Sequence, residues 1–173
     1  EKIAGIFNND GMTKSDDIDN ADVLFVNTCT IRENADDKLY GTLGHLKKWK
    51  SLAPNRRLLV GGCAAQKDKE LVRERAPWVD VVIGTHNTTE IINLLNQAED
   101  WGPITEIIEE TTDIETEIAA VRESSVSAFV TIQIGCNNSC TFCIVPSVRG
   151  VEISRRPSDI INEIKSLAHD GVK

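Results

Sequence analysis

The sequence lacks an apolar run long enough to cross a membrane. Its longest apolar stretches, such as residues 23–26, are only as long as a β-strand, whereas a membrane-spanning helix needs about 20 apolar residues. Aromatic residues are scarce at 5%, but hydrophobic residues make up 40% and charged residues 27% of the 173 positions. This composition is typical of a globular protein with a hydrophobic core, and we expect no membrane partner.

The N-terminus lacks both an initiating Met and the apolar core of a signal peptide. We therefore expect the sequence to be incomplete at its start. The five cysteines are odd in number and three of them are crowded together, which argues against a secreted disulfide framework. We predict a cytoplasmic protein, because that compartment keeps thiols reduced.

Negative charge is concentrated in one segment. Residues 99–123 carry nine acidic residues and one basic residue, which accounts for the whole net charge of −8. The segment is also rich in Thr and Glu and has Gly102 and Pro103 near its start, as expected of a solvated linker. We therefore predict a domain over residues 1–98, an acidic linker over residues 99–123, and a second domain that begins in residues 124–173.

The first predicted domain alternates short apolar strands with helical patterns. The expected strands are residues 23–26, 58–60 and 79–83, and the expected helices are residues 30–52, 64–75 and 87–97. Thr30 followed by Glu33 has the pattern of a capping box at the start of a helix. Such alternation predicts an α/β fold, with an open parallel sheet flanked by helices on both faces. Residues 1–10 have the pattern of a further helix.

Cys29 and Cys63 each follow one of these strands directly. Because the carboxyl ends of parallel strands share one edge of the sheet, both thiols are expected at one site. Two small buried hydrophobic residues are an equally acceptable interpretation. A metal site on these two cysteines would need at least one more ligand, and residues 1–98 contain no other cysteine.

Cys136, Cys140 and Cys143 lie within eight residues, with gaps of three and two residues. Three thiols can hold one metal centre, but a structural zinc site takes four protein ligands, and an iron–sulfur cubane usually takes four thiolates. With three thiolates, one iron keeps a position for another ligand. A zinc-binding module and an electron carrier with iron–sulfur clusters are the alternatives.

The cysteine triplet follows a predicted strand over residues 127–134, and a predicted helix begins near Pro157 and stops at Gly171. This unit is similar to the first βα repeat of a barrel, with the ligands at the catalytic end. Arg149, Arg155 and Arg156 flank the loop, so we predict that they bind substrate or cofactor. A separate basic run could contact phosphates or complement a helix dipole; it comprises Lys47, Lys48, Lys50, Arg56 and Arg57.

The triplet, with Phe142 just before its last cysteine, resembles the signature of the radical S-adenosylmethionine superfamily. Residues 27–33 (NTCTIRE), 61–64 (GGCA) and 143–150 (CIVPSVRG) resemble the methylthiotransferase family. Residues 31–35 and 154–160 are more similar to its tRNA branch than to its ribosomal-protein branch. This resemblance covers nearly the whole chain except the acidic segment.

The resemblance implies two [4Fe–4S] clusters. Cys136, Cys140 and Cys143 would hold the first, whose fourth iron binds S-adenosylmethionine for cleavage to a 5′-deoxyadenosyl radical. Cys29 and Cys63 would hold an auxiliary cluster together with a cysteine upstream of residue 1. The second domain would be the start of a radical S-adenosylmethionine (β/α) partial barrel.

The resemblance also implies an enzyme that adds a methylthio group to an isopentenyl-modified adenosine beside the anticodon of tRNA. Its partners would be tRNA and a reductant such as a flavodoxin or ferredoxin, and we expect a monomer. Another modified tRNA adenosine and a ribosomal protein are alternative substrates. Because the chain is expected to be incomplete at both ends, it is expected to be inactive alone.

Overall fold

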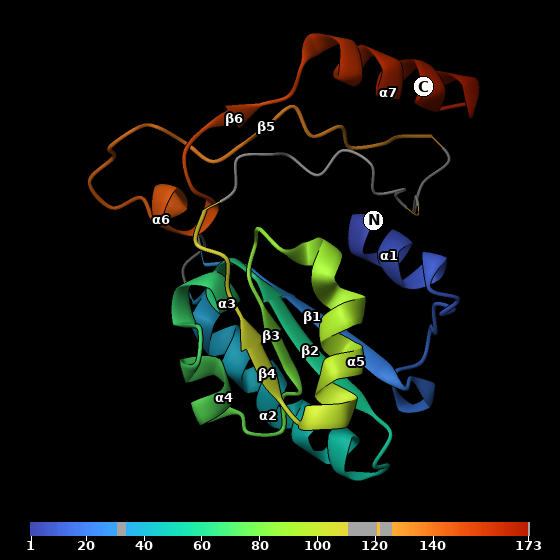
Figure 1. Ribbon diagram of the computed structural model, residues 1–173, viewed down its shortest axis with the longest axis vertical. Coiled ribbons are helices and arrows are strands. Elements are labelled where there is room, and N and C mark those ends of the chain that lie inside the picture. Colours follow the sequence, from blue (N-terminus) through green and yellow to red (C-terminus); the bar gives the residue numbers. More distant parts are fainter. Residues whose placement is uncertain (31–33, 111–120, 122–125, 173) are drawn as a thin grey trace.

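We describe the protein from a computed structural model, which covers residues 1–30, 34–110, 121 and 126–172. Its main body is a four-stranded sheet between two layers of helices, and residues 133–172 form a smaller layer above one edge of that sheet (Figure 1). The sheet and its flanking helices confirm the predicted α/β fold. None of the described helices is both long and apolar enough to cross a membrane.

The four strands are parallel and lie in the order in which they occur in the sequence. They are β1 (Val23–Thr28), β2 (Arg57–Gly62), β3 (Val81–Ile83) and β4 (Ile104–Glu106). Strands β1 and β2 pair over six residues, whereas β3 pairs with each of its neighbours over three. All four carboxyl ends therefore meet at the same edge of the sheet.

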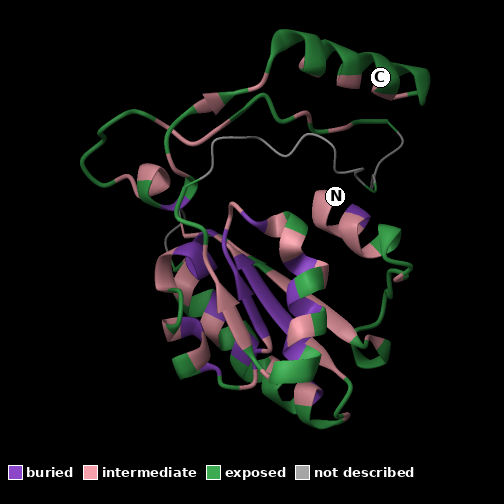
Figure 2. Ribbon diagram, viewed as in Figure 1, coloured by how far each residue is buried: buried purple, intermediate pink, exposed green. Residues whose placement is uncertain are grey.

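Helices cover both faces of the sheet because side chains alternate along each strand. Leu58 and Val60 of β2 pack on one face, whereas Leu59 between them packs on the other. The first face is covered by α2 (Ala35–Ser51), α3 (Cys63–Asp68) and α4 (Leu71–Arg75). The second face is covered by α1 (Lys2–Asn9) and α5 (Ile91–Trp101). The central strands and the inner sides of the helices are buried (Figure 2).

Three predicted helices differ in their limits. The helix expected over residues 87–97 is present as a 3-10 turn over Thr88–Glu90 followed by α5, which ends at Trp101. The helix expected from residue 30 begins at Ala35, after Asn34 in the left-handed conformation, and Glu33 of the expected capping box lies outside the described residues. The helix expected over residues 64–75 is divided into α3 and α4 at Lys69, whose φ is +51°. A positive φ breaks the α-helical ladder, and neither Gly nor Pro marks this break in the sequence.

Strand β4 lies in the segment that was expected to be a linker. Residues 99–101 are the last turn of α5, and Ile104–Glu106 extend the sheet beside β3. Gly102 makes the turn between them, with a φ of +89° that favours glycine. Most of the remaining acidic segment, residues 111–120 and 122–123, lies outside the described residues.

The strand expected over residues 127–134 is wrong in its length. Only Gln133–Ile134 form a strand, β5, which pairs antiparallel with β6 (Ile153–Ser154). Residues 127–132 have strand-forming side chains, but a strand needs a hydrogen-bonded neighbour, and β6 supplies only two residues. The predicted helix is present as α7 (Pro157–His169), and a short helix, α6 (Val145–Arg149), precedes β6.

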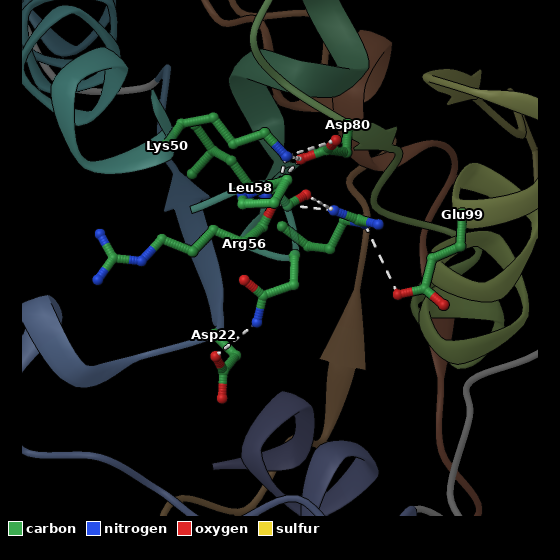
Figure 3. Close-up of polar contacts among 9 residues, drawn as sticks. Asp22, Lys50, Arg56, Leu58, Asp80 and Glu99 are labelled. Atoms are coloured by element: carbon green, nitrogen blue, oxygen red, sulfur yellow. Dashed lines mark hydrogen bonds and ion pairs between the residues drawn. The ribbon is translucent and has the colours of Figure 1, made fainter. Parts of the chain in front are cut away.

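Asp80 joins three strands at the amino ends of the sheet (Figure 3). Its Oδ2 accepts a hydrogen bond from Leu58 N at 2.7 Å and contacts Lys50 Nζ at 2.6 Å. Its backbone N–H donates to Leu58 O, and its carbonyl accepts from Ile104 N. The Asp80 carboxylate thus joins the start of β2 to the end of α2, and the Asp80 backbone joins the starts of β2 and β4.

The predicted basic run lies around the C-terminus of α2. Lys50 Nζ also donates to Arg56 O, and Arg56 Nη1 donates to Trp49 O at 2.8 Å. Arg57 Nη1 donates to Pro54 O at 2.8 Å. These contacts with carbonyl oxygens match the helix-terminus alternative for Lys50 and Arg56.

We predict that Asp80→Ala lowers the free energy of unfolding by about 3 kcal/mol, because it leaves the largely buried Lys50 without its carboxylate partner. Urea denaturation of both proteins would measure the difference. Glu99→Gln is the control, because the Arg57–Glu99 ion pair is 3.7 Å long and its Glu99 side chain is about half exposed. Loss of this pair should cost less than about 0.5 kcal/mol. Equal losses in the two variants would contradict this role of Asp80.

Candidate functional site

Cys29 and Cys63 lie at neighbouring strand ends, as expected. Cys29 directly follows β1, Cys63 directly follows β2, and the last paired residues of these strands are Thr28 and Gly62. The Cys29 side chain is exposed, whereas Cys63 is the first residue of α3 and is 1% exposed. The structure therefore brings both thiols to the carboxyl edge of the sheet, one at the surface and one beneath it.

The Thr28 hydroxyl connects the two positions. It donates to Gly61 O at 2.7 Å and accepts from the backbone N–H groups of Ala64 and Ala65 at 3.1 and 3.4 Å. The residue before Cys29 thus provides an acceptor for the first turn of the helix that begins at Cys63. Gly62 has a φ of +97°, and a Cβ atom there would lie 2.5 Å from Thr28 O, so this close approach requires glycine.

A cavity of about 260 Å³ opens beside Cys29, between the end of β1 and the first turns of α2. Its lining is mixed, with one cationic side chain from Lys38. The other lining residues are Val26, Asn27, Thr28, Cys29, Ala35, Leu39 and Thr42. Cys29 therefore faces a space with both polar and apolar walls.

Cys136, Cys140 and Cys143 lie on the loop between β5 and α6. Cys140 is exposed and the other two are half-buried. Cys143 N donates to Cys140 O at 3.1 Å, and Cys136 N donates to Gly150 O at 3.2 Å, which closes the base of the loop. Gly135 has a φ of +71°, and a Cβ atom there would lie 2.0 Å from Val151 O. The two segments at the base of the loop therefore approach so closely that only glycine fits at position 135.

None of the five cysteines, all of which are described, forms a disulfide. Across the described part of the chain, no three His, Cys, Asp or Glu side chains are gathered in an arrangement that would hold a metal ion. The structure thus places the triplet on one loop without drawing its thiols together. Their role as cluster ligands stays a prediction.

Helix α6 lies against the main body beside α3 (Figure 1), a contact that no local sequence pattern indicates. Val148 is 1% exposed, and its carbonyl accepts from Thr85 Oγ1 at 2.7 Å. Arg149 Nε donates to Cys63 Sγ at 3.3 Å. Of the three predicted arginines, Arg149 therefore contacts one of the predicted thiols.

Gln66 holds Thr85 in place, and no pattern in the sequence predicts this role for Gln66. Gln66 is 2% exposed, its Oε1 accepts from Thr85 N at 2.9 Å, and its Nε2 donates to Ile108 O at 2.9 Å. A Cβ atom on Gly84 would lie 2.3 Å from this Oε1. The loop after β3 is thus fixed where α6 contacts it.

Arg155 and Arg156 lie in different surroundings. Arg155 Nη1 is 2.5 Å from Glu163 Oε2 and donates to Thr131 O at 2.8 Å, and its side chain is only 5% exposed. It therefore connects α7 to the segment before β5. Arg156 is exposed and immediately precedes α7. For both residues, cofactor binding stays a prediction.

The far end of α3 is anchored to α2. Tyr40 Oη donates to Asp68 Oδ2 at 2.6 Å, and Lys67 contacts both Asp36 and Asp68. Burial raises the pKa of Tyr40 above its ordinary value of 10.0, and the Asp68 carboxylate acts in the same direction. Burial lowers the pKa of Lys67, but hydrogen bonds to Asp36 and Asp68 outweigh it and raise that pKa overall.

Residues 1–84 match the family described as "Uncharacterized protein family UPF0004". The chain is 47% identical over 173 residues to the tRNA-2-methylthio-N(6)-dimethylallyladenosine synthase of Mycolicibacterium smegmatis, a match that covers 99% of this chain and 34% of that protein. It is 49% identical over 177 residues to the protein of the same name from Cutibacterium acnes, covering 100% of this chain and 36% of that protein. The chain thus spans about a third of the length of these relatives.

We predict that Tyr40, the only tyrosine, ionises well above pH 10 in the folded protein and near pH 10 in urea. Because the pKa is raised by folding, this stabilisation is complete below pH 10 and is lost as the pH rises through the folded-state pKa. Ultraviolet absorbance of tyrosinate measures both titrations. Asp68→Asn should lower the folded-state midpoint, and identical midpoints with and without urea would contradict the anchor.

Proposed function

We propose that this chain belongs to the methylthiotransferase family and takes part in adding a methylthio group to an isopentenyl-modified adenosine of tRNA. The observation that carries this proposal is the position of the thiols. Cys29 and Cys63 lie at one edge of the sheet, and the loop with Cys136, Cys140 and Cys143 is joined to that edge through α6. The names of the relatives favour tRNA over a ribosomal protein as the substrate.

The residues on the loop fit an iron–sulfur cluster. Cys136, Cys140 and Cys143 supply three thiols on one short loop, none of which is consumed by a disulfide, and thiolates are the usual ligands of such clusters. They would hold a [4Fe–4S] cluster and leave one iron for S-adenosylmethionine. When bound, this pair supplies the radical chemistry that removes hydrogen from an unactivated position.

The remaining residues position these groups. Cys29 and Cys63 would hold an auxiliary [4Fe–4S] cluster with one further cysteine, which this sequence does not contain. The cavity beside Cys29 is lined by Lys38 and by side chains of both β1 and α2, and it borders the exposed thiol of that pair. Arg155 and Arg156 would contribute cationic groups to cofactor binding near the loop.

The partners follow from this chemistry. The substrate would be a tRNA whose adenosine beside the anticodon carries the isopentenyl group. A flavodoxin or ferredoxin would supply electrons, and a second S-adenosylmethionine would supply the methyl group. We place the protein in the cytoplasm as a monomer.

We predict that anaerobic reconstitution with iron and sulfide gives a brown, oxygen-sensitive protein. Adding S-adenosylmethionine after reduction should change its EPR spectrum, because the cofactor would bind the iron that no cysteine holds. Cys140→Ala should abolish this change, whereas Cys29→Ala should leave it. A colourless protein that retains zinc in air would contradict the proposal, and so would an EPR spectrum that does not change when S-adenosylmethionine is added.

The substrate is tested separately with the full-length protein. Mass spectrometry of nucleosides from tRNA that carries isopentenyladenosine should reveal an added methylthio group. Unmodified tRNA together with a methylthio group on a ribosomal protein would assign the enzyme to the other branch of the family.

A further inference from the structure

Arg149 contacts the thiol of Cys63, and the adjacent Gly150 contacts the backbone of Cys136. Arg149 Nε donates to Cys63 Sγ at 3.3 Å, and the two residues are 86 positions apart in the sequence. The next carbonyl, Gly150 O, accepts from Cys136 N at 3.2 Å. Two adjacent residues therefore connect the buried thiol at the end of β2 to the first cysteine of the triplet.

This connection is built from specific contacts. Gly150 has a φ of +71°, a conformation that favours glycine and turns the chain sharply after α6. The buried Val148 and its hydrogen bond from Thr85 hold the other side of α6. These contacts hold the backbone on both sides of Arg149.

We propose that Arg149 is a positioning residue, which holds the loop of Cys136, Cys140 and Cys143 at a fixed place relative to Cys63. This inference rests on the proposed function, because transfer of sulfur between the triplet and the Cys29/Cys63 pair would require a fixed distance between the two groups. It differs from the cofactor-binding role expected for Arg149 from the sequence, because the partner of its Nε is a thiol of the N-terminal domain.

A purely apolar contact would not explain this arrangement. Val148 alone could bury α6 against the main body, but it specifies no orientation for the next residue. A guanidinium N–H that donates to a sulfur atom has a defined direction, and a charged donor gives a stronger hydrogen bond than a neutral one. Arg149 therefore fixes how α6 lies above Cys63 as well as holding it there.

Alkylation of the metal-free protein tests this inference. Cys63 is 1% exposed, so iodoacetamide can reach it only when the covering residues open. Arg149→Ala removes a hydrogen bond from a charged donor, and the rate at Cys63 should rise about tenfold or more. Arg149→Lys keeps the charge and should give an intermediate rate. Mass spectrometry of the Cys63 peptide measures the rate, with the exposed Cys140 as an internal reference.

Arg73→Ala is the matched control, because Arg73 belongs to α4 and pairs with Glu70 on the surface. In this variant the alkylation rate at Cys63 should equal that of the wild type. If Arg149→Ala does not fold, Thr85→Val, which removes the hydrogen bond to Val148 O, should also raise the rate. A wild-type rate in Arg149→Ala, or an equal rise in Arg73→Ala, would overturn the inference.

A spectroscopic readout separates positioning from general stability. After reconstitution and reduction, Arg149→Ala should alter the EPR spectrum at unchanged circular dichroism, and Arg149→Lys should restore it in part. A spectrum identical to the wild type would overturn the positioning role. The alkylation result needs neither cofactor nor tRNA, so its failure would leave the proposed function intact.

Discussion

The arrangement of the site depends on the hydrogen bonds of the Thr28 hydroxyl group. It contacts the carbonyl of Gly61 and the first backbone N–H groups of α3, and so joins the ends of β1 and β2 to the helix that begins at Cys63. Cys29 follows this residue directly. The Thr28 side chain thereby determines the positions of Cys29 and Cys63. Gly62 allows β2 to approach Thr28 this closely, because a Cβ atom would not fit there. At the opposite edge of the sheet, hydrogen bonds of Asp80 join the amino ends of three strands.

The second group of thiols is attached to this frame through α6. The buried Val148 and the hydrogen bond from Thr85 fix the helix, and Arg149 reaches Cys63. Thr85 depends in turn on Gln66 of α3, so the helix that carries Cys63 also supports the loop that receives α6. The residues of the site are therefore held together by hydrogen bonds to α3. That helix is anchored at its start by Thr28 and at its end by Tyr40 and Asp68.

The parts of this arrangement that depend on local patterns could be predicted from the sequence. Apolar runs identified β1 and β2, and the rule for parallel strands placed Cys29 and Cys63 at one edge. The sequence does not predict β4, because three residues in acidic surroundings carry little strand signal. It predicts a strand over residues 127–132 that is absent, because strand propensity does not report whether a partner strand is available. The contact between Arg149 and Cys63 spans 86 positions, and no local pattern encodes it.

The arrangement of the thiols is tested most directly by locating iron in a crystal of the anaerobically reconstituted full-length protein. Anomalous scattering measured at the iron absorption edge distinguishes iron from zinc and gives its position. We expect an iron–sulfur cluster on Cys136, Cys140 and Cys143, with Arg149 still in contact with the segment that carries Cys63. Iron bound elsewhere, or zinc on the triplet with its four positions filled by protein ligands, would contradict it.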